Sequence, residues 1–140
     1  MRGRVLVIAG SDSGGGAGIQ ADIKTITALD AFAMTAISAL TAQDTNGVSG
    51  IHDVPPAFIR EQMMVVLADL GADAIKTGML HTPAVIDTVV EALLDTNIGT
   101  PLVVDPVMLA KSGDALISSE ATETLVRRLI PMATVLTPNL

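Results

Sequence analysis

Cysteine, tryptophan and tyrosine are absent from the 140 residues, and Phe32 and Phe58 are the only phenylalanines. Without cysteine the chain has no disulfides, no iron–sulfur ligands and no thiolate zinc site, which fits a reducing compartment. The scarcity of aromatic rings means that a flat heterocyclic ligand would lie mostly against aliphatic side chains, methionine or backbone.

Basic residues are also few, since 8 lysines and arginines against 15 aspartates and glutamates give a formal net charge of −7. Nucleic-acid binding usually needs a basic face, so this balance argues against it. Phosphate ligands stay possible, because backbone N–H groups and helix N-termini bind them. No stretch approaches the ~20 apolar residues of a membrane span, and the apolar run at residues 5–9 is too short for a signal-peptide core. We therefore expect a cytoplasmic protein that binds neither nucleic acid nor membrane.

The length is that of one domain, and 49% hydrophobic residues are enough for a packed core. Short apolar runs, typical of strands buried on both faces, alternate with segments of helical periodicity. The strands are expected over residues 5–9, 33–42, 74–77, 102–104 and 133–136, and the helices over about 19–29, 56–70, 83–95 and 119–129. We predict a single α/β domain over residues 1–140, with three layers: a mostly parallel sheet and helices on both faces.

Local signals support several of these boundaries. Asn46-Gly47 marks a turn, and Thr82 is placed to cap a helix that begins with proline. Pro131 is expected to end the last helix, and Asp22 is expected in the first turn of its helix, where the helix dipole favours a carboxylate. The pattern ends on a strand without a covering helix, so we expect the chain to be part of a longer fold.

The most informative segment is residues 10–22, between the first strand and the first helix, where α/β proteins bind small ligands. It has four glycines in five residues, and glycine lets a ligand touch bare backbone. The segment lacks the lysine of a P-loop, and counted from Gly14 it lacks the third glycine of the dinucleotide fingerprint. Two interpretations stay open at this point: a cradle for a small ligand, and a turn without a ligand.

Residues 10–25 resemble the N-terminal signature of the hydroxymethylpyrimidine/phosphomethylpyrimidine kinases, a thiamine-biosynthesis family of the ribokinase-like superfamily. Residues 41–43, 76–80, 104–114 and 137–139 also match family motifs, in the same order along the chain. The resemblance implies an incomplete ribokinase-like fold, because family members are nearly twice as long and only their N-terminal half is matched.

The resemblance implies a pyrimidine pocket. The Gln43 amide offers a donor and an acceptor that complement an aminopyrimidine edge, Met79 can pack on the ring, and Asp22 can accept from a substrate N–H or hydroxyl. From the residues alone, Asp22 can equally be a helix-dipole carboxylate, Met79 a core residue and Gln43 a solvated strand end. The full set of implied substrate-binding residues is Gly10, Ala17, Asp22, Gln43, Met79 and Val107.

The resemblance also places Asp105 and Asn139 near the phosphates and the metal, which implies ATP and Mg²⁺ as the further ligands. Residues 111–113 can approach an anion or form a solvated loop. Lys76 stands inside an expected strand, so it needs a carboxylate or carbonyl partner and is interpreted as structural. His52 and His81 have no metal-ligand spacing and are expected at the surface.

The implied reaction is transfer of the ATP γ-phosphoryl group to 4-amino-5-hydroxymethyl-2-methylpyrimidine and then to its monophosphate, by an enzyme that is usually a homodimer. The family's general base and Gly-Thr-Gly-Cys anion hole match no segment of the 140 residues, so the resemblance places both beyond Leu140. We therefore assign no catalytic residue in this chain and expect little or no kinase activity from it alone. Asp44 departs from the usual asparagine, and the acidic residue that follows Thr-Pro-Asn in the family is not present.

Three alternatives stay open. The chain can belong to a pyridoxal or pyridoxine kinase of the same superfamily. It can be a non-catalytic module that binds a pyrimidine or pairs with a separate C-terminal fragment. It can also be a truncated gene product with no function of its own.

Overall fold

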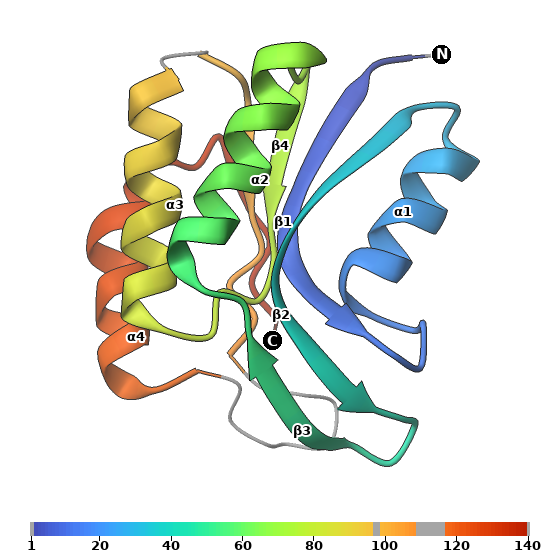
Figure 1. Cartoon of the computed structure of the whole chain (residues 1–140), viewed down its shortest axis with the longest axis vertical. Coiled ribbons are helices and arrows are strands. Elements are labelled where there is room, and N and C mark those ends of the chain that lie inside the picture. Colours follow the sequence, from blue (N-terminus) through green and yellow to red (C-terminus); the bar gives the residue numbers. More distant parts are fainter. Residues whose placement is uncertain (1, 97–98, 109–116, 140) are drawn as a thin grey trace.

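The computed structural model describes residues 2–96, 99–108 and 117–139 and contains a six-stranded sheet in the order β3-β2-β1-β4-β5-β6 (Figure 1). Five strands run parallel, and β3 runs antiparallel to β2. The strands are β1 (Arg4–Asp12), β2 (Phe32–Gln43), β3 (Val48–Asp53), β4 (Ala74–Thr77), β5 (Leu102–Val104) and β6 (Val135–Leu136). The helices are α1 (Gly18–Ala28), α2 (Pro56–Asp69), α3 (Pro83–Thr96) and α4 (Ser119–Thr124).

The predicted three-layer α/β arrangement is confirmed. In Figure 1, α1 lies alone on one side of the sheet, and α2, α3 and α4 lie on the other. The larger core joins the sheet to these three helices, whereas a smaller cluster of Val7, Ala9 and Ile19 lies under α1. Alternate residues of β1 therefore face opposite layers, as expected of a strand buried on both faces. No helix among the described residues is long and apolar enough to cross a membrane.

β3 was not predicted, because residues 44–53 have a polar sequence that was interpreted as a turn region. The turn at Asn46-Gly47 is present, but it joins β2 to β3 in a hairpin. Most of β3 is partly or fully exposed, which explains why its sequence lacks an apolar run. The number of described strands is therefore six, not five.

The last helical segment also differs from the prediction. Ser118 caps α4, because its side chain accepts from the amide of Ala121. The helix then widens into a π turn over Leu125–Leu129 and closes with a 3-10 turn over Ile130–Met132. Pro131 lies inside that final turn rather than after the helix, since a 3-10 turn of this length tolerates a residue without an N–H near its start.

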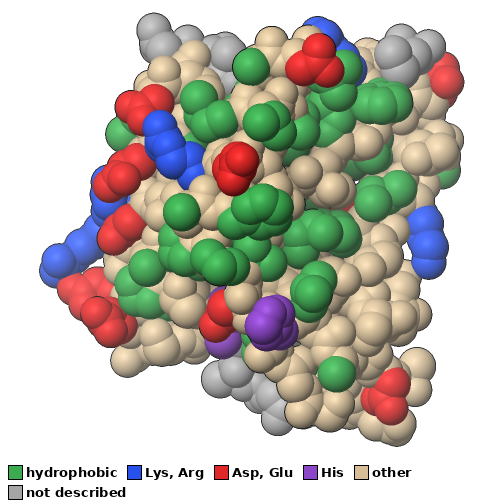
Figure 2. All heavy atoms as spheres, in the orientation of Figure 1, with side chains coloured by type: hydrophobic (Ala, Val, Ile, Leu, Met, Phe, Trp, Pro, Cys, Tyr) green, Lys and Arg blue, Asp and Glu red, His purple; other side chains and the backbone are tan. Residues whose placement is uncertain are grey.

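Apolar side chains lie on both sides of α2, on the side that faces the core and on the outer side. Phe58 and Val65 are exposed on α2, and Leu94 is exposed on α3. Figure 2 shows hydrophobic side chains gathered over this helical face. The prolines at its start, not amphipathic periodicity, therefore made α2 predictable from the sequence.

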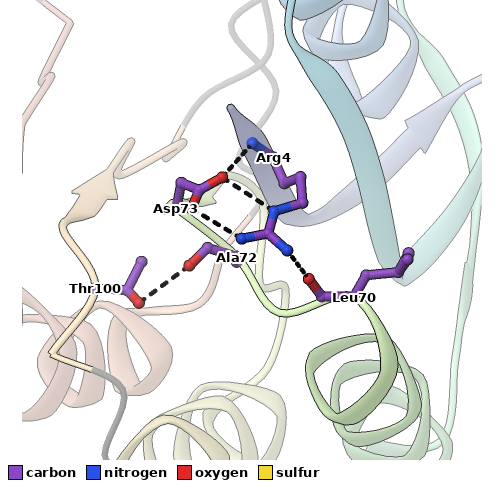
Figure 3. Close-up of polar contacts among 5 residues, drawn as sticks. All are labelled: Arg4, Leu70, Ala72, Asp73 and Thr100. Carbon is purple, nitrogen blue, oxygen red and sulfur yellow. Dashed lines mark hydrogen bonds and ion pairs between the residues drawn. The ribbon is translucent and has the colours of Figure 1, made fainter. Parts of the chain in front are cut away.

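At the amino end of the sheet, Arg4 ties β1 to the segment that leads into β4 (Figure 3). Its guanidinium donates to both oxygens of Asp73, at 3.1 and 3.0 Å, and to the carbonyl of Leu70. These bonds hold the pKa of Asp73 well below its usual range, at about 2. The paired central strands are thereby fixed at their starts, although both side chains are exposed to solvent.

The Arg4–Asp73 contact predicts how stability depends on pH. A carboxyl whose pKa is lowered by folding stabilises the native state above its unfolded pKa, and this contribution is lost as pH falls through the folded value. The excess stability of the wild type over Asp73→Asn should therefore be constant above about pH 4 and shrink as pH approaches about 2. Chemical denaturation at a series of pH values measures it, with Asp69→Asn as an exposed control. An excess that persists unchanged to the acid end would exclude this pairing as its source.

Thr77 gives a second prediction. It is fully buried at the end of β4, and its hydroxyl oxygen has no hydrogen-bond partner among the described residues. An unsatisfied buried hydroxyl costs free energy, so Thr77→Val should raise the free energy of unfolding by roughly 1 kcal/mol. Thermal denaturation checks this, with Thr35→Val as a matched strand substitution. A lower melting temperature for Thr77→Val would mean that the hydroxyl is hydrogen-bonded in solution.

Candidate functional site

The carboxyl ends of β1 and β4 lie side by side at the point where the strand order reverses. From β1 the chain crosses to β2 on one side and later returns to β4 on the other side. Small ligands of open α/β sheets bind outside the strand ends at such a switch point. The two segments that follow these strands, the glycine-rich turn and Gly78-Met79, are therefore the first place to look for a site.

The glycine-rich turn is wrapped around a buried carboxylate. Asp12, only 5% exposed, accepts from the backbone amides of Gly14, Gly16 and Ala17 at 2.7–2.9 Å, and its carbonyl accepts from the amide of Gly15. These amides are consequently not available to a phosphate in this conformation. The turn is a fixed wall of the site and not an anion-binding nest.

Two glycines stand at close approaches, of which only the one at Gly18 is to backbone and requires glycine. Gly18 begins α1 with a φ of +57°, and a Cβ there would lie 2.5 Å from the carbonyl oxygen of Gly10. A Cβ at Gly10 would lie 2.7 Å from the Cε of Met79. The turn can therefore fold back onto β1, and Met79 can lie on the bare backbone of Gly10.

Met79 belongs to an apolar cluster beside the turn. It is 8% exposed and packs with Ala39, and Val107 is a partly buried neighbour of the same cluster. Its carbonyl accepts from the buried Ser38 hydroxyl at 2.6 Å. Gly10, Met79 and Val107, three of the residues predicted for the pocket, are thus brought together, and Met79 also serves as a core residue.

Gln43 ends β2 on the other side of the turn. The Ser13 hydroxyl accepts from its backbone amide at 2.8 Å and donates to its carbonyl at 2.9 Å. The side-chain oxygen of Gln43 lies 3.1 Å from the hydroxyl of Thr41. Gln43 is also half-buried. Because its backbone is held against the turn, it is not merely a solvated strand end.

Asp22 and Lys76 form an ion pair between α1 and β4. The ammonium of Lys76 donates to both oxygens of Asp22, at 2.9 and 2.8 Å, and lies 3.7 Å from an oxygen of Asp105. Lys76, which was predicted to need a carboxylate or carbonyl partner, thus has two carboxylate partners, Asp22 and Asp105. The prediction for the helix is wrong in one respect: α1 begins at Gly18, and its first turn contains no acidic residue, so Asp22 lies in the second turn.

Asp105 follows β5 and is half-buried beside this pair. Burial raises the pKa of Asp105 above its usual value, the ammonium of Lys76 opposes that shift, and the carboxylate of Asp22 adds to it. The carboxylate predicted near the phosphates is therefore already in contact with a cation of this chain.

The carboxyl-terminal part of the predicted site is only partly described. Asn139 follows β6 at the same edge of the sheet and is exposed, and no bond joins it to the other predicted site residues in the described parts of the chain. The predicted anion contact of residues 111–113 lies outside the described residues. Leu140, beyond which the general base and the anion hole are expected, also lies outside them. The base and the anion hole therefore stay predictions, and no catalytic residue is assigned within the chain.

In the part of the chain that the structure describes, the two histidines belong to no group that could hold a metal ion. His52 is exposed as expected, but His81 is half-buried, and its Nδ1 lies 2.6 Å from an oxygen of Asp53. Among residues 2–96, 99–108 and 117–139, no group of three or more histidines and carboxylates is placed to hold a metal ion.

Two surface pockets lie away from the switch point. One is lined by Ile75, Leu93, Leu94, Gly99, Thr100, Leu102 and Met132, and the other by Asp87, Glu120, Glu123, Thr124, Arg127 and Arg128.

Sequence reasoning missed Asp12, the residue that organises the turn. The signal was present, because an aspartate two residues before a glycine is typical of a side chain that bonds the backbone ahead of it.

Comparison with known proteins agrees with this geometry. The family model described as phosphomethylpyrimidine kinase matches residues 12–140. A hydroxymethylpyrimidine/phosphomethylpyrimidine kinase of Mycobacterium leprae is 51% identical over 137 residues, which cover 98% of this chain and 49% of that protein. The chain therefore spans about half the length of the curated relatives it matches.

Solved structures give the same result. The crystal structure of phosphomethylpyrimidine kinase from Clostridium difficile 630 matches with a TM-score of 0.91 and 47% identity, over 97% of this chain and 58% of that one. The pyridoxal kinase from Staphylococcus aureus, solved with AMP-PCP and pyridoxal, matches with a TM-score of 0.81 and 40% identity, over 98% of this chain and 48% of that one. With the family model matched over nearly its whole length, this chain belongs to the phosphomethylpyrimidine kinase family.

Proposed function

We propose that this chain supplies the pyrimidine-binding part of a kinase of thiamine biosynthesis. The reaction would transfer the γ-phosphoryl group of ATP to 4-amino-5-hydroxymethyl-2-methylpyrimidine and then to its monophosphate. The observation that carries the proposal is the meeting of Gly10, Met79 and Val107 at the switch point, with Gln43 and Asp22 on either side. The names of the relatives support the substrate class.

Gln43 would recognise the aminopyrimidine edge. Its side-chain nitrogen can donate to a ring nitrogen, and its oxygen can accept from the exocyclic amino group while keeping its contact with Thr41, since a carbonyl oxygen has two lone pairs. The bonds from Ser13 fix the backbone of Gln43 before any ligand arrives. Less conformational entropy is then lost when the pyrimidine binds.

Met79 and Val107 would hold the ring by apolar contact. The thioether is polarisable and adapts to a flat partner, and the exposed remainder of the Met79 side chain borders the turn. Ala17 would contribute the small surface at the start of α1, since its amide is already bonded to Asp12. Ligand recognition in this part of the chain would therefore come from shape and from one amide, not from the glycine amides.

The phosphate side would lie toward Asp105 and Asn139, as the family resemblance implies. Mg²⁺ in kinases usually takes one or two carboxylates together with substrate phosphates. Asp105 is a carboxylate at this edge, but an ammonium lies 3.7 Å from it, and the described residues do not by themselves complete a magnesium site. We therefore assign no step to the ion and no general base to the 140 residues.

A pyridoxal kinase is the second candidate. The Staphylococcus aureus enzyme solved with pyridoxal has a closely similar fold over 98% of this chain, so the same edge could accept a pyridine ring. In the aminopyrimidine, Gln43 would make one hydrogen bond to the amino group and one to the adjacent ring nitrogen. Pyridoxal, a pyridine, has no such amino group. Direct comparison of the two ligands therefore separates the candidates.

Isothermal titration calorimetry of the 140-residue chain tests the proposal. We expect the hydroxymethylpyrimidine to bind at least tenfold more tightly than pyridoxal, because each hydrogen bond to Gln43 contributes on the order of 1 kcal/mol. Gln43→Ala should weaken pyrimidine binding by roughly tenfold to a hundredfold and leave the pyridoxal affinity nearly unchanged.

Asn46→Ala is the matched control, since it removes another amide from the same hairpin without touching the proposed pocket. Tighter binding of pyridoxal would transfer the assignment to the second candidate. An absence of binding by both ligands would overturn the proposal for this chain.

A further inference from the structure

Lys76 is a charged residue that the proposed pyrimidine contacts do not use. It stands in β4, the strand next to β1, yet its ammonium reaches the carboxyl edge of the sheet. Gly78 lies beside it, since a Cβ at Gly78 would be 3.8 Å from the ammonium, an ordinary contact distance. The ammonium thus lies next to the residue that precedes Met79.

The ammonium joins two carboxylates from different layers. Asp22 comes from α1 and receives two bonds, and Asp105 follows β5 and lies at 3.7 Å. All three side chains are about one-fifth to one-quarter exposed, so water screens them only in part. Two carboxylates and one ammonium give this cluster a single net negative charge.

The charged side chains of the neighbouring turns have hydrogen-bond partners of their own. Asp12 is enclosed by backbone amides, Lys24 donates to the carbonyl of Gly15 at 2.9 Å, and Asp44 is bonded by its own turn. Among the described residues, Lys76 therefore determines whether the α1 side of the site carries one or two uncompensated negative charges.

We infer that Lys76 is a positioning and specificity-determining residue: it fixes the Asp22 carboxylate at the pyrimidine site and, by neutralising it, makes the site select the neutral form of an aminopyrimidine. This inference rests on the proposed function. An aminopyrimidine is a weak base that can bind either neutral or protonated on a ring nitrogen. Without the ammonium, two neighbouring carboxylates would favour uptake of a proton by the bound ring.

Proton linkage distinguishes this role from a purely structural one. Calorimetry of the 140-residue chain near pH 7, in buffers of different ionisation enthalpy, counts the protons taken up when the hydroxymethylpyrimidine binds. The wild type should take up almost none. Lys76→Met should bind roughly tenfold more weakly and take up a substantial fraction of a proton, so that its affinity recovers as pH falls.

Three variants complete the test. Lys76→Arg keeps the charge and should restore the low proton uptake even where Lys76→Met does not fold. Lys76→Met combined with Asp105→Asn has the net charge of the wild type, so it should take up few protons while still binding weakly, because Asp22 is no longer held. Arg127→Met removes one positive charge from an exposed helical site and should change neither quantity.

The outcomes separate the two claims. If the wild type binds and Lys76→Met takes up no more protons than the wild type, or Lys76→Arg takes up more, this inference is overturned and the proposed function stands. If the wild type does not bind the pyrimidine, the proposed function fails for this chain, and the role of Lys76 in ligand selection fails with it.

Discussion

The hydrogen bonds from backbone amides to the carboxylate of Asp12 are the constraint on which the candidate site depends. They fold a flexible glycine-rich segment into one shape, and they place its start and its end against β1. A charged acceptor bonded by several amides is stronger than the same number of neutral bonds, which offsets part of the entropy lost by the glycines. The carboxylate also occupies the amides that a phosphate would need, so the turn acts as a wall for a neutral ring.

The neighbouring strands complete the site because their ends meet at one edge. β2 brings Gln43, β4 brings Met79, and β5 is followed by Asp105 and Val107. Positions far apart in the sequence thus lie beside one another for a topological reason, as a parallel sheet aligns its carboxyl ends. Lys76 adds an electrostatic link between the two sides of this edge. Gly10, Gln43 and Lys76 thus stand in strands and Asp22 in a helix, whereas Met79, Asp105 and Val107 lie one to three residues beyond strand ends.

The fold could largely be predicted from the sequence because most strands are short apolar runs and most helices carry proline or serine at their starts. β3 was missed since an exposed antiparallel strand has no apolar signature. The predicted helix end at about Leu129 coincides with the end of the π turn, but the change from α-helix to π turn at Leu125 and the 3-10 turn over Ile130–Met132 were not predicted. For the site, the family resemblance identified residues that the structure does bring together at one edge. The role of Asp12 was missed although the sequence carried a signal for it, whereas the two partners of Lys76 could not be predicted, because Asp22 and Asp105 are brought to it by the arrangement of α1, β4 and β5.

The edge of the sheet around the Asp12 turn is the proposed binding site for an aminopyrimidine. Titration of the ¹⁵N-labelled 140-residue chain with the hydroxymethylpyrimidine, followed by NMR, tests it most directly. Saturable shifts of the amide signals of Gly10, Gln43 and Met79 are expected, with no change at the Arg4–Asp73 end of the sheet. Shifts confined to the apolar pocket around Leu93 and Leu102, or no saturable shift at all, would contradict it.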